Sequence, residues 1–200
     1  MRTRGARNRA TPERRREILD AALDVFLEHG YANASLQAIS AKLKVTKGSV
    51  YHHFRKKEEI AVVLYSEAIA AIHEVISQAL VDVPSARAGI EGIVLAYLSW
   101  FEAHPRLGAF VFEIMDGRSL DAHIESVRRS QRAFTDAMTS WIAPYVQSGE
   151  VAQLEPTLYV PLVIGPSRDF LREWLPHRRG SEIEAARGAL PIAAWRCIAG

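Results

Sequence analysis

The chain has 200 residues, 48% hydrophobic and 24% charged, as in a folded globular protein, and its single cysteine, Cys197, excludes an internal disulfide and a cysteine-based zinc site. No apolar stretch approaches the ~18 residues that a membrane span requires, and no apolar segment follows the arginine-rich N-terminus, so we expect a cytoplasmic protein without a membrane contact or secretion signal. The net charge of +2 divides into +8 for residues 1–57 and −6 for residues 58–200. This asymmetry indicates either that the N-terminal part binds a polyanion or that the protein has an ordinary solvated surface with a basic tail.

A basic arm and a first helix open the chain. Residues 1–10 hold four arginines and no apolar anchor, so we expect a mobile arm that either follows a DNA minor groove or only raises non-specific affinity. Thr11 and Pro12 form a helix start, with a cap followed by a proline in the first turn. Apolar residues then recur at helical spacing as far as the stop at Gly30.

Two short helices follow and carry the functional pattern. Ser35 caps the first and Thr46 the second, and a four-residue junction over 43–46 separates them. This spacing is typical of a helix-turn-helix, here about residues 35–54, whose second helix enters the DNA major groove with its N-terminal end toward the bases. The exposed N-terminal side of that helix is expected to present Thr46, Lys47, Gly48 and Ser49, and its far end Tyr51, His52 and His53, which can donate to phosphates.

The rest of the chain remains helical. Apolar residues at 3–4 residue spacing predict helices over 57–81, 85–103, around 110–114, over 119–146, over 155–175 and over 181–198, the last begun by a capping box of Ser181 and Glu184. No alternating strand pattern is present. We therefore expect an all-α fold of about nine helices: a basic arm (1–10), a three-helix DNA-binding domain (11–57) and a larger helical ligand-binding and dimerisation domain (58–200).

One block of the sequence is highly specific. VTKGSVYHHF at residues 45–54 is followed three residues later by Lys57-Glu58, and Ile18–Ala22, Phe26, Gly30-Tyr31 and Ile39 precede it. Together these residues resemble the TetR family of bacterial transcription regulators. The resemblance covers only the first quarter to third of the chain.

The resemblance implies a homodimer that binds a palindromic operator in double-stranded DNA and is released by a small molecule, as a repressor in most cases. It implies that Gln37 reads a base or a phosphate and that Lys57 contacts a phosphate beside a helix N-terminus, which itself favours anions. The full set of expected DNA contacts is Ser35, Gln37, Thr46, Lys47, Gly48, Ser49, Tyr51, His52, His53 and Lys57. Lys44 stands where the family usually has glycine, at a cost of about 1 kcal/mol if the residue is left-handed.

By the same resemblance, the C-terminal domain should hold a small apolar or amphipathic effector and the dimer interface. Met and aromatic residues recur along 119–146, a pattern more often core than pocket, and the Gln131 amide interrupts this otherwise buried line. The last two helices, about 155–175 and 181–198, are the expected dimer interface, because their apolar and alanine-rich faces allow close packing. The candidate ligand contacts are Trp100, Phe101, His104, Phe110, Met115, Gln131, Phe134, Met138 and Trp141.

Other classes of protein have weaker support. His73-Glu74 begins like a zinc-protease HExxH motif, but Ser77 stands where the second histidine should be. No phosphate-binding loop, Rossmann glycine run or nucleophile turn is present, so we expect no enzyme, no metal and no cofactor. The alternatives that remain are a helical small-molecule-binding protein and an activator without effector-released repression. A DNA affinity that falls steeply with salt would separate a DNA-binding regulator from a protein that only binds small molecules.

Overall fold

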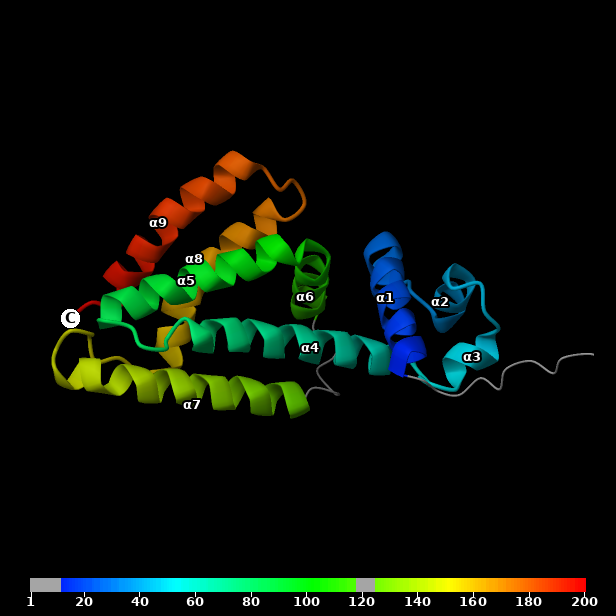
Figure 1. The fold of residues 1–200 in the computed structure, drawn as a ribbon, viewed down its shortest axis with the longest axis horizontal. Helices are drawn as coiled ribbons and strands as arrows, with labels where there is room; N and C mark the ends of the chain where they lie inside the picture. The colour runs from blue at the N-terminus through cyan, green and yellow to red at the C-terminus, as the bar shows by residue number, and fades with distance from the viewer. Residues whose placement is uncertain (1–11, 118–124) are drawn as a thin grey trace, which may run out of the picture.

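The computed structural model describes residues 12–117 and 125–200, and the described chain consists of nine α-helices without a β-strand (Figure 1). This confirms the predicted all-α class. The expected arm over 1–10, the cap Thr11 and the predicted helix start at Ser119 lie outside the described residues. The helices are α1 (Pro12–His29), α2 (Leu36–Lys42), α3 (Lys47–Tyr51), α4 (Lys57–Gln78), α5 (Ala86–Ala103), α6 (Pro105–Gly117), α7 (Glu125–Gln147), α8 (Pro156–Trp174) and α9 (Gly180–Ile198).

The helices α1, α2 and α3 form a small lobe at one end of the molecule (Figure 1). Its core contains Phe26 from α1, Ile39 from α2 and Val50 from α3, all fully buried. The Ser35 hydroxyl accepts a hydrogen bond from the Ala38 N–H at 3.2 Å, which confirms the predicted cap of α2. Lys44, in the turn before α3, is left-handed with φ 54°. The lysine therefore occupies a conformation that favours glycine.

The helix α4 joins the small lobe to the larger one (Figure 1). Its 22 residues span ~33 Å at 1.5 Å per residue. By length and hydropathy alone this helix could cross a membrane, so the expectation that no stretch approaches a membrane span is wrong. Its buried face includes Leu64, Ile72 and Ile76 and packs in the hydrophobic core, as in the core helix of a globular domain.

The larger lobe is built on α5, which packs against α4, α8 and α9. The two helices expected at the dimer interface, α8 and α9, bury many of their apolar residues within the protomer, including Val163, Trp174 and Ala194. The predicted capping box at Ser181 is wrong: α9 begins one residue earlier, and no side chain caps it. The Trp174 indole N–H donates to the Arg179 carbonyl at 2.9 Å, and this contact helps fix the turn that leads into the helix.

The helix α6 lies between the two lobes. Phe110 of α6 stacks on Phe26 of α1 with ring centroids 5.5 Å apart, and Arg106 forms an ion pair with Asp24. The Glu113 carboxylate accepts a hydrogen bond from the Tyr31 N–H, just after α1, at 2.5 Å. An apolar stack and two polar contacts thus join α6 to the small lobe.

Candidate nucleic-acid interface and ligand cavity

Exposed residues of α2 and α3 meet on one surface of the small lobe. The Lys47 ammonium donates to the Gln37 amide oxygen at 2.9 Å, so two side chains predicted to contact DNA from different helices lie side by side. Thr46 and Gly48 are exposed, and a Cβ built at Gly48 would meet nothing within 4 Å. A binding partner can therefore approach the backbone closely at Gly48.

Ser49 does not belong to this exposed surface. Its relative exposure is 9%, and it lies on the buried side of α3 next to Val50, so the prediction of an exposed Ser49 is wrong. The helix α3 has only five residues, and two of them, Ser49 and Val50, are buried. Ser35 is exposed, but its hydroxyl already caps α2.

The far end of the helix-turn-helix presents three polar rings. Tyr51 and His52 are exposed, while His53 is half-buried and meets the His52 ring edge to face. Burial, followed by the positive charges of His52, Arg14 and Arg15, lowers the pKa of His53 below its ordinary value. At neutral pH, His53 can therefore offer a phosphate a neutral N–H but little positive charge.

Lys57 has a structural role that the sequence did not reveal. Its ammonium donates to the carbonyl oxygens of Tyr31 and Ala32, both at 2.7 Å, and lies 4.8 Å from the centre of the Tyr31 ring. The side chain thus braces the start of α4 against the turn after α1. The predicted phosphate contact would use the remaining N–H of the ammonium.

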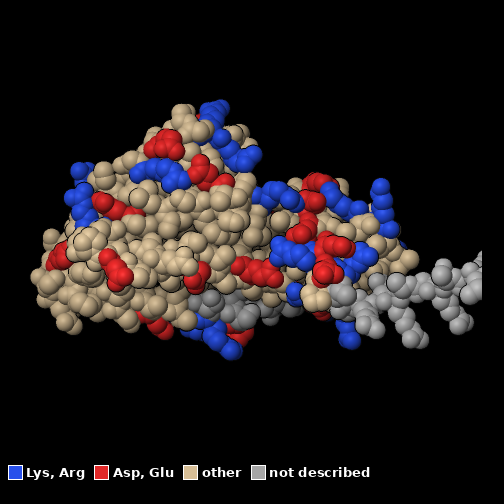
Figure 2. Space-filling model, viewed as in Figure 1, with Lys and Arg blue, Asp and Glu red and all other residues tan. Residues whose placement is uncertain are grey.

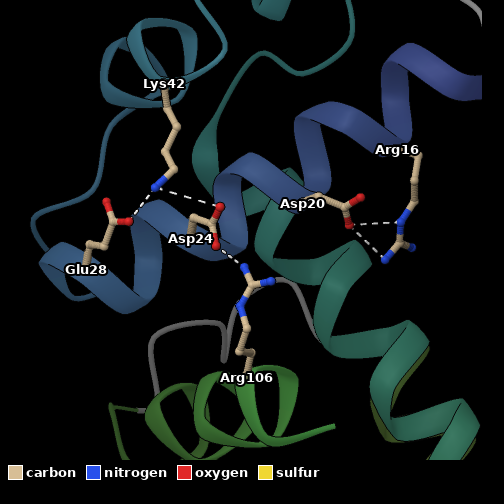
Figure 3. A network of polar contacts seen from close by, with 6 residues as sticks. All are labelled: Arg16, Asp20, Asp24, Glu28, Lys42 and Arg106. Carbon is tan, nitrogen blue, oxygen red and sulfur yellow. Dashed lines mark hydrogen bonds and ion pairs between the residues drawn. The ribbon is translucent and has the colours of Figure 1, made fainter.

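Charge pairing differs between the two sides of the small lobe. Among the carboxylates of α1, Asp20 pairs with Arg16, Glu28 with Lys42, and Asp24 with both Lys42 and Arg106 (Figure 3). Among the described residues, no carboxylate pairs with the cations that flank α3, which are Lys44, Lys47, Arg55 and Lys56. Figure 2 shows lysine, arginine and acidic side chains side by side on the small lobe. The positive charge around α3 is therefore available to an external anion.

A cavity of about 370 Å³ lies in the larger lobe between α4, α5, α6, α7 and α8. Its volume falls in the range of small-molecule sites, ~300–1,000 Å³. The lining residues are Tyr65, Ile69, Ile72, His73, Ile76, Tyr97, Phe101, Val111, Met115, Gln131, Phe134, Thr135, Thr157, Val160, Pro161, Ile164 and Arg168.

Four of the nine predicted ligand contacts line this cavity: Phe101, Met115, Gln131 and Phe134. Gln131 is exposed, so the expectation of a buried amide is wrong.

The other five predicted ligand contacts pack elsewhere. Phe110 stacks on Phe26 toward the small lobe, and Met138 is buried in the core. Trp100 stacks on the exposed His104. The Trp141 ring fills the space beside Gly89, where a Cβ would approach it to 2.4 Å.

The sequence did not reveal the α4 and α8 walls of the cavity. His73 of α4 stacks on Phe134 of α7 with ring centroids 4.1 Å apart, and burial lowers the pKa of His73 to about 4. The available signal was a histidine on the apolar face of a long helix, which in the sequence suggests only an incomplete zinc motif. For Arg168, on α8, no pattern in the neighbouring sequence predicted a position in the cavity wall.

Comparisons with known proteins agree with this arrangement. The family described as "Bacterial regulatory proteins, tetR family" matches residues 18–64. The HTH-type transcriptional repressor AcnR of Corynebacterium diphtheriae is 37% identical over 65 residues, 32% of this chain, so the chain spans only 34% of that relative. The HTH-type transcriptional regulator RutR of Escherichia coli K12 is 26% identical over 196 residues, which cover 94% of this chain and 85% of RutR.

A solved structure extends the likeness to the whole fold. A bacterial regulatory protein in the tetR family from Rhodococcus RHA1 has a TM-score of 0.79 at 22% identity, covering 94% of this chain and 98% of that one. These similar proteins are transcription regulators rather than enzymes, in agreement with the expectation that the chain is not an enzyme. Residues 18–64 therefore match the TetR-family model, and the described chain has the fold of a solved TetR-family regulatory protein.

Proposed function

We propose that the chain represses transcription by binding a palindromic operator as a homodimer, and that a small molecule in the cavity releases it from DNA. The observation that carries the DNA part of this proposal is the exposed surface of Gln37, Lys47 and Gly48, surrounded by cations that no described carboxylate neutralises. Binding of operator DNA places this activity in the cytoplasm. Activation of transcription is the second candidate, and the name of AcnR as a repressor favours the first.

In the proposed complex, residues 11–57 act as the DNA-binding domain and α3 lies in the major groove. Lys47 and Gln37 face base edges, where a cation and an amide can read the acceptors and donors of the bases. Gly48 allows close approach of the backbone. Tyr51 and His52 contact phosphates together with the cations around α3, which set the position of the lobe on the duplex.

The proposed dimer interface uses the outer faces of α8 and α9, within residues 155–175 and 181–198. Leu158 and Ile192 are large apolar side chains that are 46% and 38% exposed in the protomer. A two-fold axis through these helices would present two copies of α3 to half-sites whose centres lie ~34–36 Å apart, or a small multiple of that distance.

The proposed release of DNA depends on α6, because this helix contacts both functional regions. Val111 and Met115 line the cavity, whereas Phe110 and Glu113 contact the small lobe. A ligand that favours a different position of α6 would therefore change the position of α1 and, with it, that of α3. Differential binding of the ligand to the two arrangements would supply the free energy of release.

The test is a fluorescence-anisotropy titration of duplexes from the DNA that flanks the gene, at several salt concentrations. The proposal expects two protomers per palindromic site and an affinity that falls steeply with salt, because several phosphates are neutralised. A matched variant, Lys47→Ala, should bind the palindrome more weakly and discriminate it less from other DNA. A monomer that ignores every duplex in dilute buffer would contradict the proposal.

A further inference from the structure

The cavity is elongated rather than round. Tyr65 and Ile76 line it from α4, and Thr157 and Arg168 line it from α8. At 1.5 Å per helical residue, the two members of each pair lie ~16 Å apart along their helix. A volume of about 370 Å³ spread over this length favours an extended or flat ligand over a compact one.

The wall of the cavity is mostly apolar and carries one positive charge. Among the lining residues that the structure describes, Arg168 is the single residue charged at neutral pH, because burial lowers the pKa of His73 to about 4 and keeps it neutral. Burial also raises the pKa of Tyr65 and of Tyr97, so both hydroxyls remain protonated and can act as neutral donors. No Asp or Glu lines the cavity among the described residues.

The charge of Arg168 has no counter-ion in the described chain. Its neighbour one turn later, Arg172, pairs with Asp116 at 2.9 Å and with Asp169 at 3.6 Å. Arg168 forms neither a hydrogen bond nor an ion pair with residues 12–117 or 125–200. It is exposed, so it marks an open end of the cavity, and its guanidinium is a planar set of donors suited to a carboxylate or a phosphate.

We propose that the cavity binds an elongated apolar molecule that carries a single anionic group, with the anion paired to Arg168 and the apolar body lying along α4 and α8. A cationic ligand of the same shape would meet an uncompensated positive charge, and a neutral one would leave the guanidinium unpaired. The role of this ligand as an effector rests on the function proposed above, whereas the binding of the ligand in the cavity does not depend on that function.

The experiment compares three ten-carbon probes, decanoate, 1-decanol and decylamine, by calorimetry on the full chain, each below its solubility limit and any micelle concentration. We expect decanoate to bind most tightly. Arg168→Gln should weaken decanoate by about two- to fivefold and leave 1-decanol nearly unchanged, because an ion pair at a solvent-exposed site is lost. Arg168→Lys should retain part of the preference for the anion.

Arg128→Gln is the matched control, because it removes the same charge from a neighbouring groove between α7 and α8 but not from the cavity. The proposal is overturned if decanoate binds no more tightly than 1-decanol, if none of the probes binds, or if Arg128→Gln has the same effect as Arg168→Gln. If a thermal melt shows that Arg168→Gln is not folded, the ranking of the three probes on the wild-type chain and on the Arg168→Lys variant still tests the proposal.

The same probes added to the protein–DNA complex separate this inference from the proposed function. Binding of decanoate through Arg168 without any change in DNA affinity would support the ligand class and contradict effector release. Release of DNA by decylamine or 1-decanol, with no effect of decanoate, would overturn the ligand class and support effector release.

Discussion

Replacement of Lys57 by methionine should destabilise the protein, because the ammonium holds the turn after α1 to the start of α4. Hydrogen bonds to a charged group contribute ~1.5–3 kcal/mol each, and a cation over an aromatic ring ~0.5–1 kcal/mol at a partly exposed site. Lys57 makes two such hydrogen bonds and one such ring contact. Water can replace part of them at the exposed Ala32 carbonyl, so we expect Lys57→Met to lower the free energy of unfolding by ~1–3 kcal/mol.

Urea unfolding monitored by circular dichroism measures this loss, and the thermal midpoint should fall by ~2–4 °C for each kcal/mol in a chain of this length. Lys56→Met is the matched control, since Lys56 is exposed and forms no ion pair with a described residue. If Lys56 contacts a phosphate, its removal should lower the slope of log affinity against log salt by ~0.9 without a loss of stability. Equal stability of the two variants would refute the bracing role of Lys57.

Three further predictions concern other parts of the structure. Lys47→Ala should cost ~1–3 kcal/mol of operator discrimination and relax specificity at one base pair per half-site; unchanged discrimination among mutated operators would remove Lys47 from the base-contacting residues. Gly108→Ala should destabilise by ~1–3 kcal/mol in urea unfolding, since its Cβ would lie 2.6 Å from the Phe101 ring, whereas Gly48→Ala, with open space around it, should not. His73 has a folded-state pKa of about 4 against an ordinary 6.5, so the unfolded chain alone takes up its proton between these values and stability should fall as the pH drops from 6.5 to 4. His73→Phe should flatten that part of the stability–pH curve, and an unaltered slope would show that His73 is not its source.

The sequence predicted well the features that depend on neighbours along the chain. Ser35 as the cap of α2 follows from residues within a single turn, and so does the position of Lys44, which is left-handed where the family usually has glycine. The nine helices follow from apolar spacing, which is likewise local.

The failures concern contacts between distant segments. Ser49 lies on the buried side of a five-residue helix that packs on its neighbours, and α9 begins before Ser181, next to an Arg179 carbonyl that accepts a hydrogen bond from Trp174. Lys57 braces a turn that is 25–26 residues away in the sequence. Ten of the 17 residues that line the cavity come from α4 and α8, and in the sequence most of them are indistinguishable from ordinary core positions.

The central claim is that α3 lies in the major groove, and methylation interference on the bound operator tests it most directly. The account predicts that methylation of guanine N7, which lies in the major groove, blocks binding at two clusters about one helical turn or a small multiple apart. If Lys47 contacts a guanine, methylation of one guanine in each cluster should no longer weaken the binding of the Lys47→Ala variant. Interference confined to adenine N3, in the minor groove, or none at either atom, would contradict the claim.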